Sequence, residues 1–312
     1  MADDAFTGCY SLVEVYNLSA LDLASALPYT YVINDSINDA SGYTEDGDFV
    51  FYEYDGVSYL VGYFGSRTGV TLPEGTYTIN KYAFAGSDIT SLTVPAGIAA
   101  IGEGAFAECA ISALTATVSV LEHIDLTKLT SLTLVGESTL GATALEGCTE
   151  LVSLTLPATL TTVEDGALAN LVKLTAISVE AGSESFKTVD GSLYSLDGTV
   201  LYRAVSGTPY FTVPKGVTTI APYAFAGLTE LFSVTLDDAA ITTIGAGAFK
   251  GCASISKIEI PATVTAIGAG AFESCESLWS VGVADGNTVY SVQDGKLVQT
   301  ASGTVVWEKT EA

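Results

Sequence analysis

The sequence contains few of the residues on which catalysis and metal binding depend. His123 is the only histidine among 312 residues, so any Ser-His-Asp or Cys-His arrangement would have to use it. The motifs G-x-S-x-G, H-E-x-x-H and the phosphate-binding P-loop do not occur. The 36 acidic residues supply many carboxylates, but no spacing selects a pair for glycoside hydrolysis. We therefore predict a protein that is not an enzyme and that carries neither a cofactor nor a metal.

Basic residues and long apolar runs are also scarce. Lys and Arg number 11 against 36 Asp and Glu, which gives a formal net charge of −25. This imbalance argues against nucleic acid and anionic membrane surfaces as partners, and it favours cationic partners or divalent ions. No apolar run reaches the ~18 residues that are needed to cross a bilayer. Membrane insertion is therefore not predicted.

What the chain does contain is a repeat of 22 to 24 residues. The segment Ile244–Cys252 (IGAGAFKGC) recurs as Ile267–Cys275 (IGAGAFESC), with Phe249 and Phe272 in the same place. Further copies are centred on Phe84, Phe106, Leu145, Leu168 and Phe225, with a copy at Phe6 that the N-terminus interrupts and a degraded copy over residues 122–135. A period of this length carried by Leu, Ile and Val is typical of a solenoid, because each unit can bury its apolar face only on its neighbours.

Each copy predicts a short strand followed by a corner. Ile255, Ile258 and Ile260 end in an alternating strand, and Pro261 then removes the next backbone donor. The motif Gly-x-Gly-Ala-Phe turns the corner, since glycine adopts unusual dihedrals and alanine permits close packing of coils. We expect a short helical turn around Ala-Phe-x-x-Cys, with each Phe pointing inward to stack on the Phe of the adjacent coils.

The segment from Ile244 to Pro261, IGAGAFKGCASISKIEIP, resembles the BspA-like class of leucine-rich repeats. This resemblance extends over nearly the whole chain. It implies a right-handed solenoid of the kind found in bacterial surface and secreted proteins, and in some unicellular eukaryotes. It also implies adhesion or binding of host or matrix components, with no catalytic residues shared across the family. The predicted fold class is a β-rich repeat solenoid over residues 1–312, with a short strand and a short helical turn in each ~23-residue coil and with inserted β-hairpins.

The five cysteines share one place in the repeat. Each lies three residues after the position of the corner Phe, where other coils carry Leu; the five are Cys9, Cys109, Cys148, Cys252 and Cys275. A position that accepts either Cys or Leu is a small apolar core position. The CxxC pairs of a zinc site do not occur. We expect buried free thiols, with disulfides between adjacent coils as the alternative.

A long insert over residues 17–77 interrupts the repeats. Asn34–Asp48 is polar and acidic, and it is expected to form a loop. Phe49–Tyr54 and Val57–Tyr63 follow it as two strands around the turn Asp55-Gly56, which is a strong signal for a two-residue hairpin.

Two further interruptions resemble the first. Residues 186–211 contain a hairpin that turns at Asp197-Gly198, and residues 284–312 repeat it as a C-terminal hairpin or cap. At the other end, the opening Met-Ala-Asp-Asp-Ala-Phe has no basic or apolar segment of a signal peptide and begins inside a repeat. We therefore expect the export signal and flanking coils to be missing from this chain.

The insert over residues 17–77 is also the candidate binding surface. Seven of the sixteen tyrosines fall within residues 29–63, and tyrosine offers apolar area, a hydrogen-bonding tip and few torsions to freeze. Alternation along the hairpin places Phe49 and Phe51 on one face and Tyr52 on the other. The predicted partner-binding residues are Tyr52, Tyr54, Tyr59, Asp39, Asp46 and Asp48. The side-chain oxygens of the Asn34–Asp48 loop are also compatible with an irregular calcium site, although no EF-hand register fits. The alternative is a plain solvated loop.

Two functions remain open from the sequence. The first is an extracellular or cell-surface adhesion module that presents a repeat scaffold to a protein or glycan partner. The acidic surface favours a cationic partner. The second is a structural unit that associates end to end into a surface or matrix array. The expected location is secreted or cell-surface in both cases.

Overall fold

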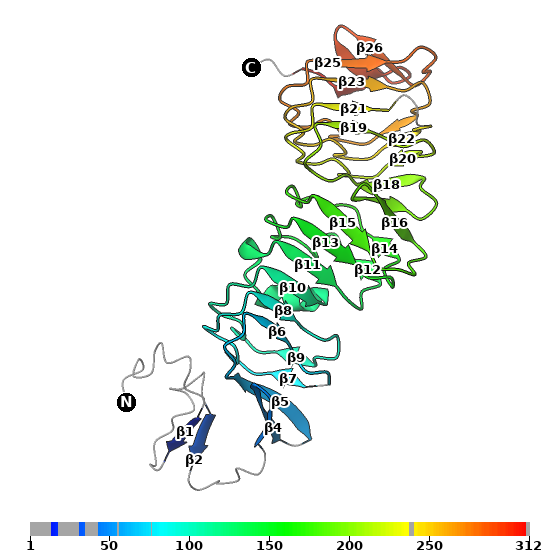
Figure 1. Cartoon of the computed structure of the whole chain (residues 1–312). Helices are drawn as coiled ribbons and strands as arrows, with labels where there is room; N and C mark the ends of the chain where they lie inside the picture. Colours follow the sequence, from blue (N-terminus) through cyan, green and yellow to red (C-terminus); the bar gives the residue numbers. More distant parts are fainter. Residues whose placement is uncertain are drawn as a thin grey trace. The chain divides into compact units, whose positions relative to one another are not determined.

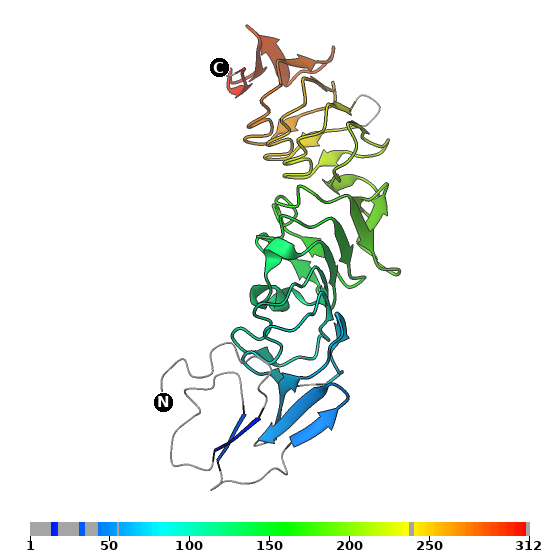
Figure 2. The ribbon, with the colours of Figure 1, turned by 60° about the vertical axis from the view of Figure 1, so that its left-hand side comes forward.

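The computed structural model describes residues 14–17, 31–34, 43–54, 56–75, 77–236 and 240–309. The chain forms two compact units, Met1–Leu129 (unit 1) and Thr130–Ala312 (unit 2), and each is described by itself. Both are β-solenoids in which short parallel strands of successive coils pair with one another (Figures 1 and 2). The predicted fold class is confirmed.

Unit 1 contains two stacks of strands and one additional pair. The elements are β1 (Glu14–Asn17), β2 (Tyr31–Asn34), β3 (Tyr43–Asp46), β4 (Phe49–Tyr54), β5 (Val57–Tyr63), β6 (Gly69–Thr71), β7 (Thr78–Ile79), β8 (Ser91–Thr93), β9 (Ala100–Ile101), β10 (Ala113–Ala116), η3 (Val118–His123) and η4 (Leu126–Lys128). One stack follows the order β3-β4-β5-β7-β9, and in the other β6, β8 and β10 pair in parallel. β1 and β2 form a separate parallel pair.

Unit 2 repeats this plan over more coils. Its strands are β11 (Ser131–Leu134), β12 (Thr139–Leu140), β13 (Ser153–Leu156), β14 (Thr162–Val163), β15 (Ala176–Val179), β16 (Phe186–Val189), β17 (Ser192–Ser195), β18 (Val200–Arg203), β19 (Tyr210–Thr212), β20 (Thr219–Ile220), β21 (Ser233–Thr235), β22 (Thr243–Ile244), β23 (Lys257–Ile260), β24 (Ala266–Ile267), β25 (Ser280–Val283), β26 (Tyr290–Gln293), β27 (Lys296–Gln299) and β28 (Val305–Trp307). Partner residues in β11, β13 and β15 lie one repeat apart, as in Leu132↔Leu154↔Ile177. The pairing therefore follows the period of the sequence.

The corners explain why the coils contain so little helix. The N–H groups of Gly247, Phe249 and Gly251 donate to carbonyls of the next coil, at 2.8 to 3.0 Å. The intervening N–H groups of Lys250 and Cys252 donate three residues back within their own corner. Every second donor is thus used between coils, so an α-helical ladder cannot form. The expected short helical turn takes the form of successive i→i+3 turns.

The corner phenylalanines form the stacks that the repeat predicts. The rings of Phe225 and Phe249 lie 4.9 Å apart at an interplanar angle of 12°, and Phe249 and Phe272 lie 5.7 Å apart at 8°. Phe84 and Phe106 stack in the same way in unit 1. Nearly parallel planes at these separations are offset stacks, the arrangement that aromatic rings prefer. The phenylalanines are therefore the centre of the core.

Glycine at the corner permits the close approach of neighbouring coils. A Cβ on Gly245 would lie 2.4 Å from the backbone nitrogen of Pro222, and one on Gly268 would lie 2.3 Å from that of Ala246. Both contacts involve backbone, which cannot turn aside as a flexible side chain can. Only glycine fits at these two positions.

The cysteines within the described residues are buried free thiols, as predicted. These are Cys109, Cys148, Cys252 and Cys275, while Cys9 lies outside the described residues. The Sγ of Cys252 donates to the carbonyl of Phe225 at 3.0 Å, and Cys275 donates to that of Phe249 at 3.1 Å. Each of these thiols therefore fastens its own corner to the Phe of the preceding coil.

Three antiparallel meanders interrupt the coils with the same register. They are β3–β5, β16–β18 and β26–β28, and each has a bulge after the second residue of its middle strand. In the first two meanders the last strand then pairs in parallel with the next coil, as in Leu60↔Ile79 and Leu201↔Ile220. Two expectations need correction. Tyr43–Asp46 is the strand β3 rather than part of a loop, and the second insert has an additional turn at Asp190-Gly191.

Candidate functional site

The meander β3–β5 brings the predicted tyrosines together. Tyr52 pairs directly with Tyr59 on one side and with Tyr43 on the other, so three tyrosine Cα positions lie in register across the sheet. Directly opposite residues in antiparallel strands have Cβ atoms only about 4.5–5.5 Å apart. The side chains of Tyr52 and Tyr59 are half-buried. Each is therefore only partly accessible at the surface of the meander.

The opposite face of the same hairpin packs on the coils. The ring of Phe49 lies 6.4 Å from that of Phe84, and Phe51 lies edge-on to Tyr77 at 5.1 Å. Tyr77 itself donates its hydroxyl proton to the carbonyl of Pro73. The two phenylalanines therefore pack this face of the meander on the coils.

The acidic residues predicted for this site are only partly described. Asp46 is exposed, whereas Asp48 is half-buried and lies 3.5 Å from the guanidinium of Arg67. Asp39 and the side chain of Tyr54 fall outside the described residues, as does most of the segment for which calcium was considered. Within the described part of the chain, no group of three or more His, Cys, Asp or Glu side chains is arranged to hold a metal ion.

His123 ends the short helix η3 in unit 1. Its side chain is 21% exposed, and its Nε2 lies 3.4 Å from Glu122 Oε1. The imidazole is therefore half-buried beside an exposed carboxylate.

Unit 2 carries a row of exposed aromatic side chains that the repeat pattern did not reveal. Tyr210 is 75% exposed, Phe232 is 55% and Trp279 is 63%. The backbone N–H of Phe232 donates to the carbonyl of Pro209 at 2.8 Å, and that of Trp279 donates to Ser256 at 3.1 Å. Phe232, Ser256 and Trp279 each come seven residues after a corner Phe, so they occupy one position in three successive coils. This shared seven-residue distance from the corner Phe is the sequence pattern that could have predicted the row.

A cleft opens beside this row, where the meander β16–β18 interrupts the coils of unit 2. It has a volume of about 410 Å³ and is formed by three chain segments, namely Val172, Lys173 and Thr175; Val205, Ser206, Gly207 and Thr208; and Gly227, Leu228, Thr229, Glu230 and Leu231. Ligand pockets fall in the range of about 300–1,000 Å³. The cleft is therefore large enough for a small ligand.

Arg203 lies behind the cleft and holds its walls together. It is fully buried, and its guanidinium donates to the carbonyls of Leu171, Tyr223 and Ala226 at 2.9 to 3.0 Å. Burial lowers the pKa of Arg203 to about 10. Its Nε is buried without a hydrogen-bond partner among the described residues. The neighbouring Ala204 N–H donates to the carbonyl of Ala224. Arg203 and Ala204 therefore supply the next corner with the donors that a regular preceding coil would supply.

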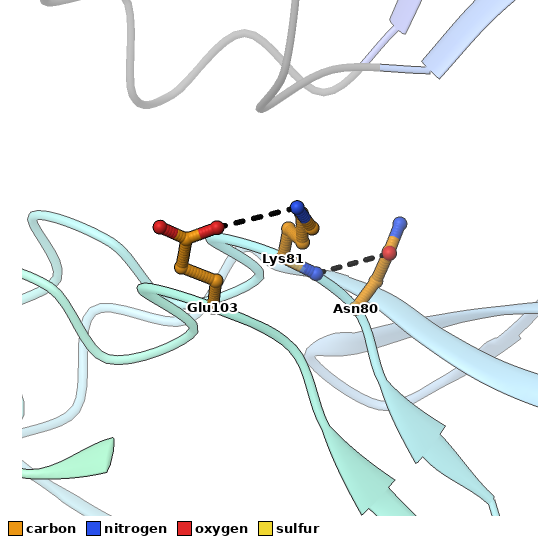
Figure 3. A network of polar contacts seen from close by, with 3 residues as sticks. All are labelled: Asn80, Lys81 and Glu103. Atoms are coloured by element: carbon orange, nitrogen blue, oxygen red, sulfur yellow. Dashed lines mark hydrogen bonds and ion pairs between the residues drawn. The ribbon is translucent and has the colours of Figure 1, made fainter.

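Most of the exposed cations are paired with carboxylates, and three of them, Lys81, Lys173 and Lys250, pair with a carboxylate of the adjacent coil. Figure 3 shows Lys81, whose ammonium group lies 3.3 Å from Glu103 and whose backbone N–H donates to the side chain of Asn80. Lys250 pairs with Glu273 in the same way in unit 2. Exposed pairs add little stability, typically below about 1 kcal/mol. Their effect here is to neutralise scarce positive charge, which leaves the surface acidic.

Together the parallel coils and the stacked corner residues define the protein as a leucine-rich-repeat solenoid. Residues 63–126, 124–196 and 202–301 match the BspA type leucine rich repeat region, in six copies. The chain belongs to this family, and the resemblance seen in the sequence is confirmed. Comparison with curated proteins returns no match.

Solved structures with the same fold come from bacterial leucine-rich-repeat proteins. One from Eubacterium ventriosum is 20% identical with a TM-score of 0.50, covering 77% of this chain and 71% of that one. The pneumococcal vaccine antigen PcpA is 17% identical with a TM-score of 0.43, over 79% and 82% of the two chains. A leucine-rich cell surface protein from Faecalibacterium prausnitzii is 18% identical with a TM-score of 0.33, over 78% and 94%. The likeness to the Eubacterium ventriosum protein shows the fold alone.

Among the described residues, no helix is long and apolar enough to cross a bilayer.

Proposed function

We propose that this chain is a binding module displayed outside a bacterial cell, and that it recognises a protein partner through the meander β3–β5. The observation that carries the proposal is the alignment of Tyr52 and Tyr59 on adjacent strands. Tyrosines on a rigid sheet give contact area at a low cost in entropy. Membership of the BspA-type family supports the extracellular location and the scaffold role.

The charge of the chain indicates what kind of protein partner fits. The formal net charge is −25, and several lysines are paired within the solenoid. An acidic surface of this kind attracts a basic partner and raises the association rate at low ionic strength. We therefore expect a partner with a basic face, with binding that weakens as salt screens the attraction.

The experiment is surface plasmon resonance of the intact chain against a panel of extracellular-matrix proteins. The variant Tyr52→Ala/Tyr59→Ala should weaken a detected interaction about tenfold, mainly through faster dissociation. Tyr210→Ala in unit 2 is the matched control and should leave the affinity unchanged. If the double variant instead unfolds unit 1 and its folded fraction binds as before, the tyrosines serve packing alone.

The structural alternative, end-to-end assembly into an array, predicts a different measurement. Light scattering over a concentration series should show one constant mass for a binding module. A mass that keeps growing with concentration would favour the array instead.

A further inference from the structure

The polar groups of the cleft in unit 2 define what it can bind. Ser206 Oγ donates its proton to the carbonyl of Leu174 at 3.0 Å, and Thr175 Oγ1 donates to Val152 at 3.3 Å. Since these protons are committed, both oxygens present lone pairs to a ligand. Exposed Thr208 and Thr229 add two hydroxyl groups that can donate or accept. The cleft therefore suits a ligand that carries several hydroxyl donors of its own.

The charges around the cleft select against anionic ligands. Lys173 is the one cation among the lining residues, and its ammonium group is bound to both carboxylate oxygens of Glu150. Glu230 adds an exposed carboxylate to the lining. An anion would meet this carboxylate and the overall charge of −25 without a free cation to offset them. These charges leave uncharged and cationic ligands, and the hydroxyl-rich lining favours an uncharged one.

The aromatic side chains next to the cleft supply a flat apolar surface. Tyr210 pairs in register with Ser233, the neighbour of Phe232, so the two aromatic residues come from adjacent coils. They follow the lining residues Thr208 and Leu231 by only one or two positions. Single exposed rings are normal on a protein surface, but an apolar patch formed by several of them often marks a binding site. An aromatic face packs well against a ring whose own face consists of C–H groups.

We propose that this cleft and the adjacent rings of Tyr210 and Phe232 form a binding site for a neutral saccharide. A sugar ring has a C–H face for the aromatic residues and hydroxyl groups around its edge for the Ser and Thr oxygens. Trp279 lies farther along the same row, beyond the small Ser256. The row therefore continues past the cleft, and the ligand is an oligosaccharide rather than a single sugar. This site is separate from the tyrosines of β3–β5 and goes beyond the protein recognition proposed for them.

The test uses the intact chain and three uncharged probes, namely maltohexaose, cellohexaose and mannohexaose. Titration is followed by calorimetry and by the fluorescence of Trp279, whose indole lies on the proposed surface. At least one probe should bind with a Kd between about 10 µM and 1 mM. Because no charge is involved, the affinity should stay constant between about 0.05 and 0.5 M salt.

Two variants test the residues. Phe232→Ser removes the stacking ring and should weaken binding about tenfold, while Thr208→Trp fills the cleft and should abolish it. Both positions are exposed, so the urea midpoint should not change. Phe64→Ser is the matched control, since Phe64 is also 55% exposed but belongs to unit 1. The unit 1 variant Tyr52→Ala/Tyr59→Ala should likewise bind the saccharide normally, which separates this site from the protein site.

Three outcomes would overturn the assignment. One is that none of the probes binds at about 10 mM, well above the expected Kd. Another is that binding persists unchanged in folded Phe232→Ser and Thr208→Trp. The third is that a heparin fragment or a proline-rich peptide occupies the cleft while the neutral probes do not, which would identify an acidic glycan or a protein as the ligand.

Discussion

Replacing Arg203 by methionine tests whether a buried charge stabilises unit 2. Methionine keeps an unbranched side chain but removes three hydrogen bonds from a charged donor. The carbonyl of Ala226 then has no donor among the described residues, whereas the carbonyls of Leu171 and Tyr223 keep the backbone N–H groups of Leu174 and Ala226. Hydrogen bonds to a charged group contribute about 1.5–3 kcal/mol each, so the three together contribute about 4.5–9 kcal/mol. In the opposite direction, the variant no longer buries a guanidinium. The pKa of Arg203 falls from 12.5 to about 10, and at 1.36 kcal/mol per pH unit this is about 3 kcal/mol.

The difference predicts a net loss of about 3 kcal/mol in the free energy of unfolding of unit 2. Both tryptophans, Trp279 and Trp307, belong to unit 2, so tryptophan fluorescence during urea unfolding reports on this unit. Lys187→Met on β16 of the same meander is the control and should change the free energy by less than about 0.5 kcal/mol. A midpoint for Arg203→Met at or above the wild-type value would refute the reasoning, because it would mean that the desolvation of the charge outweighs its hydrogen bonds.

Two further predictions concern the core. Burial raises the pKa of the thiols, to about 11 for Cys148 and Cys275 and to about 12 for Cys252. Alkylation of the native protein at pH 8 should therefore be at least about 100-fold slower than alkylation after denaturation, which should release five reactive thiols. Rapid labelling of the native protein would contradict this burial. Since the folded state favours the protonated thiol, the thiols contribute their full share to the free energy of unfolding below pH 9. This contribution should be lost as the pH rises through about 11 to 12. Phe249→Ala, which removes a ring stacked on both sides, should cost about 3–5 kcal/mol and more than Phe272→Ala, measured by urea unfolding; equal small shifts would show that these rings are not core.

The periodic features of the fold were predictable because each is repeated many times. The inward stacking of Phe249 and Phe272 follows from their equal place in neighbouring coils, and so does the burial of the cysteines. The pairing of Tyr52 with Tyr59 follows from the turn at Asp55-Gly56. A pattern that recurs in every coil leaves few alternatives for where its side chains point.

The features found at interruptions were not predictable in this way. Arg203 is a single basic residue at the end of an insert, and such a residue is usually exposed. Its burial depends on which carbonyls the next coil leaves without donors, and this is known only once the coils are in place. The strand at Tyr43–Asp46 was missed because its polar sequence pairs with β4 through the backbone. The row of Phe232 and Trp279 was missed because Ser256 lies between them.

The equal register of the meanders has a consequence for how genes of this kind can change length. Leu193 pairs with Arg203 and Leu297 pairs with Trp307, so the second and third meanders match at positions 104 residues apart. Recombination between the corresponding stretches of DNA would delete or duplicate a cassette of 104 codons and would preserve the register at the junction. A crossover after this position would place Trp307 where Arg203 now donates to three carbonyls, whereas a crossover before it carries Arg203 into the junction. The array can therefore be lengthened with its hydrogen bonds intact only when the crossover falls on the N-terminal side of Arg203.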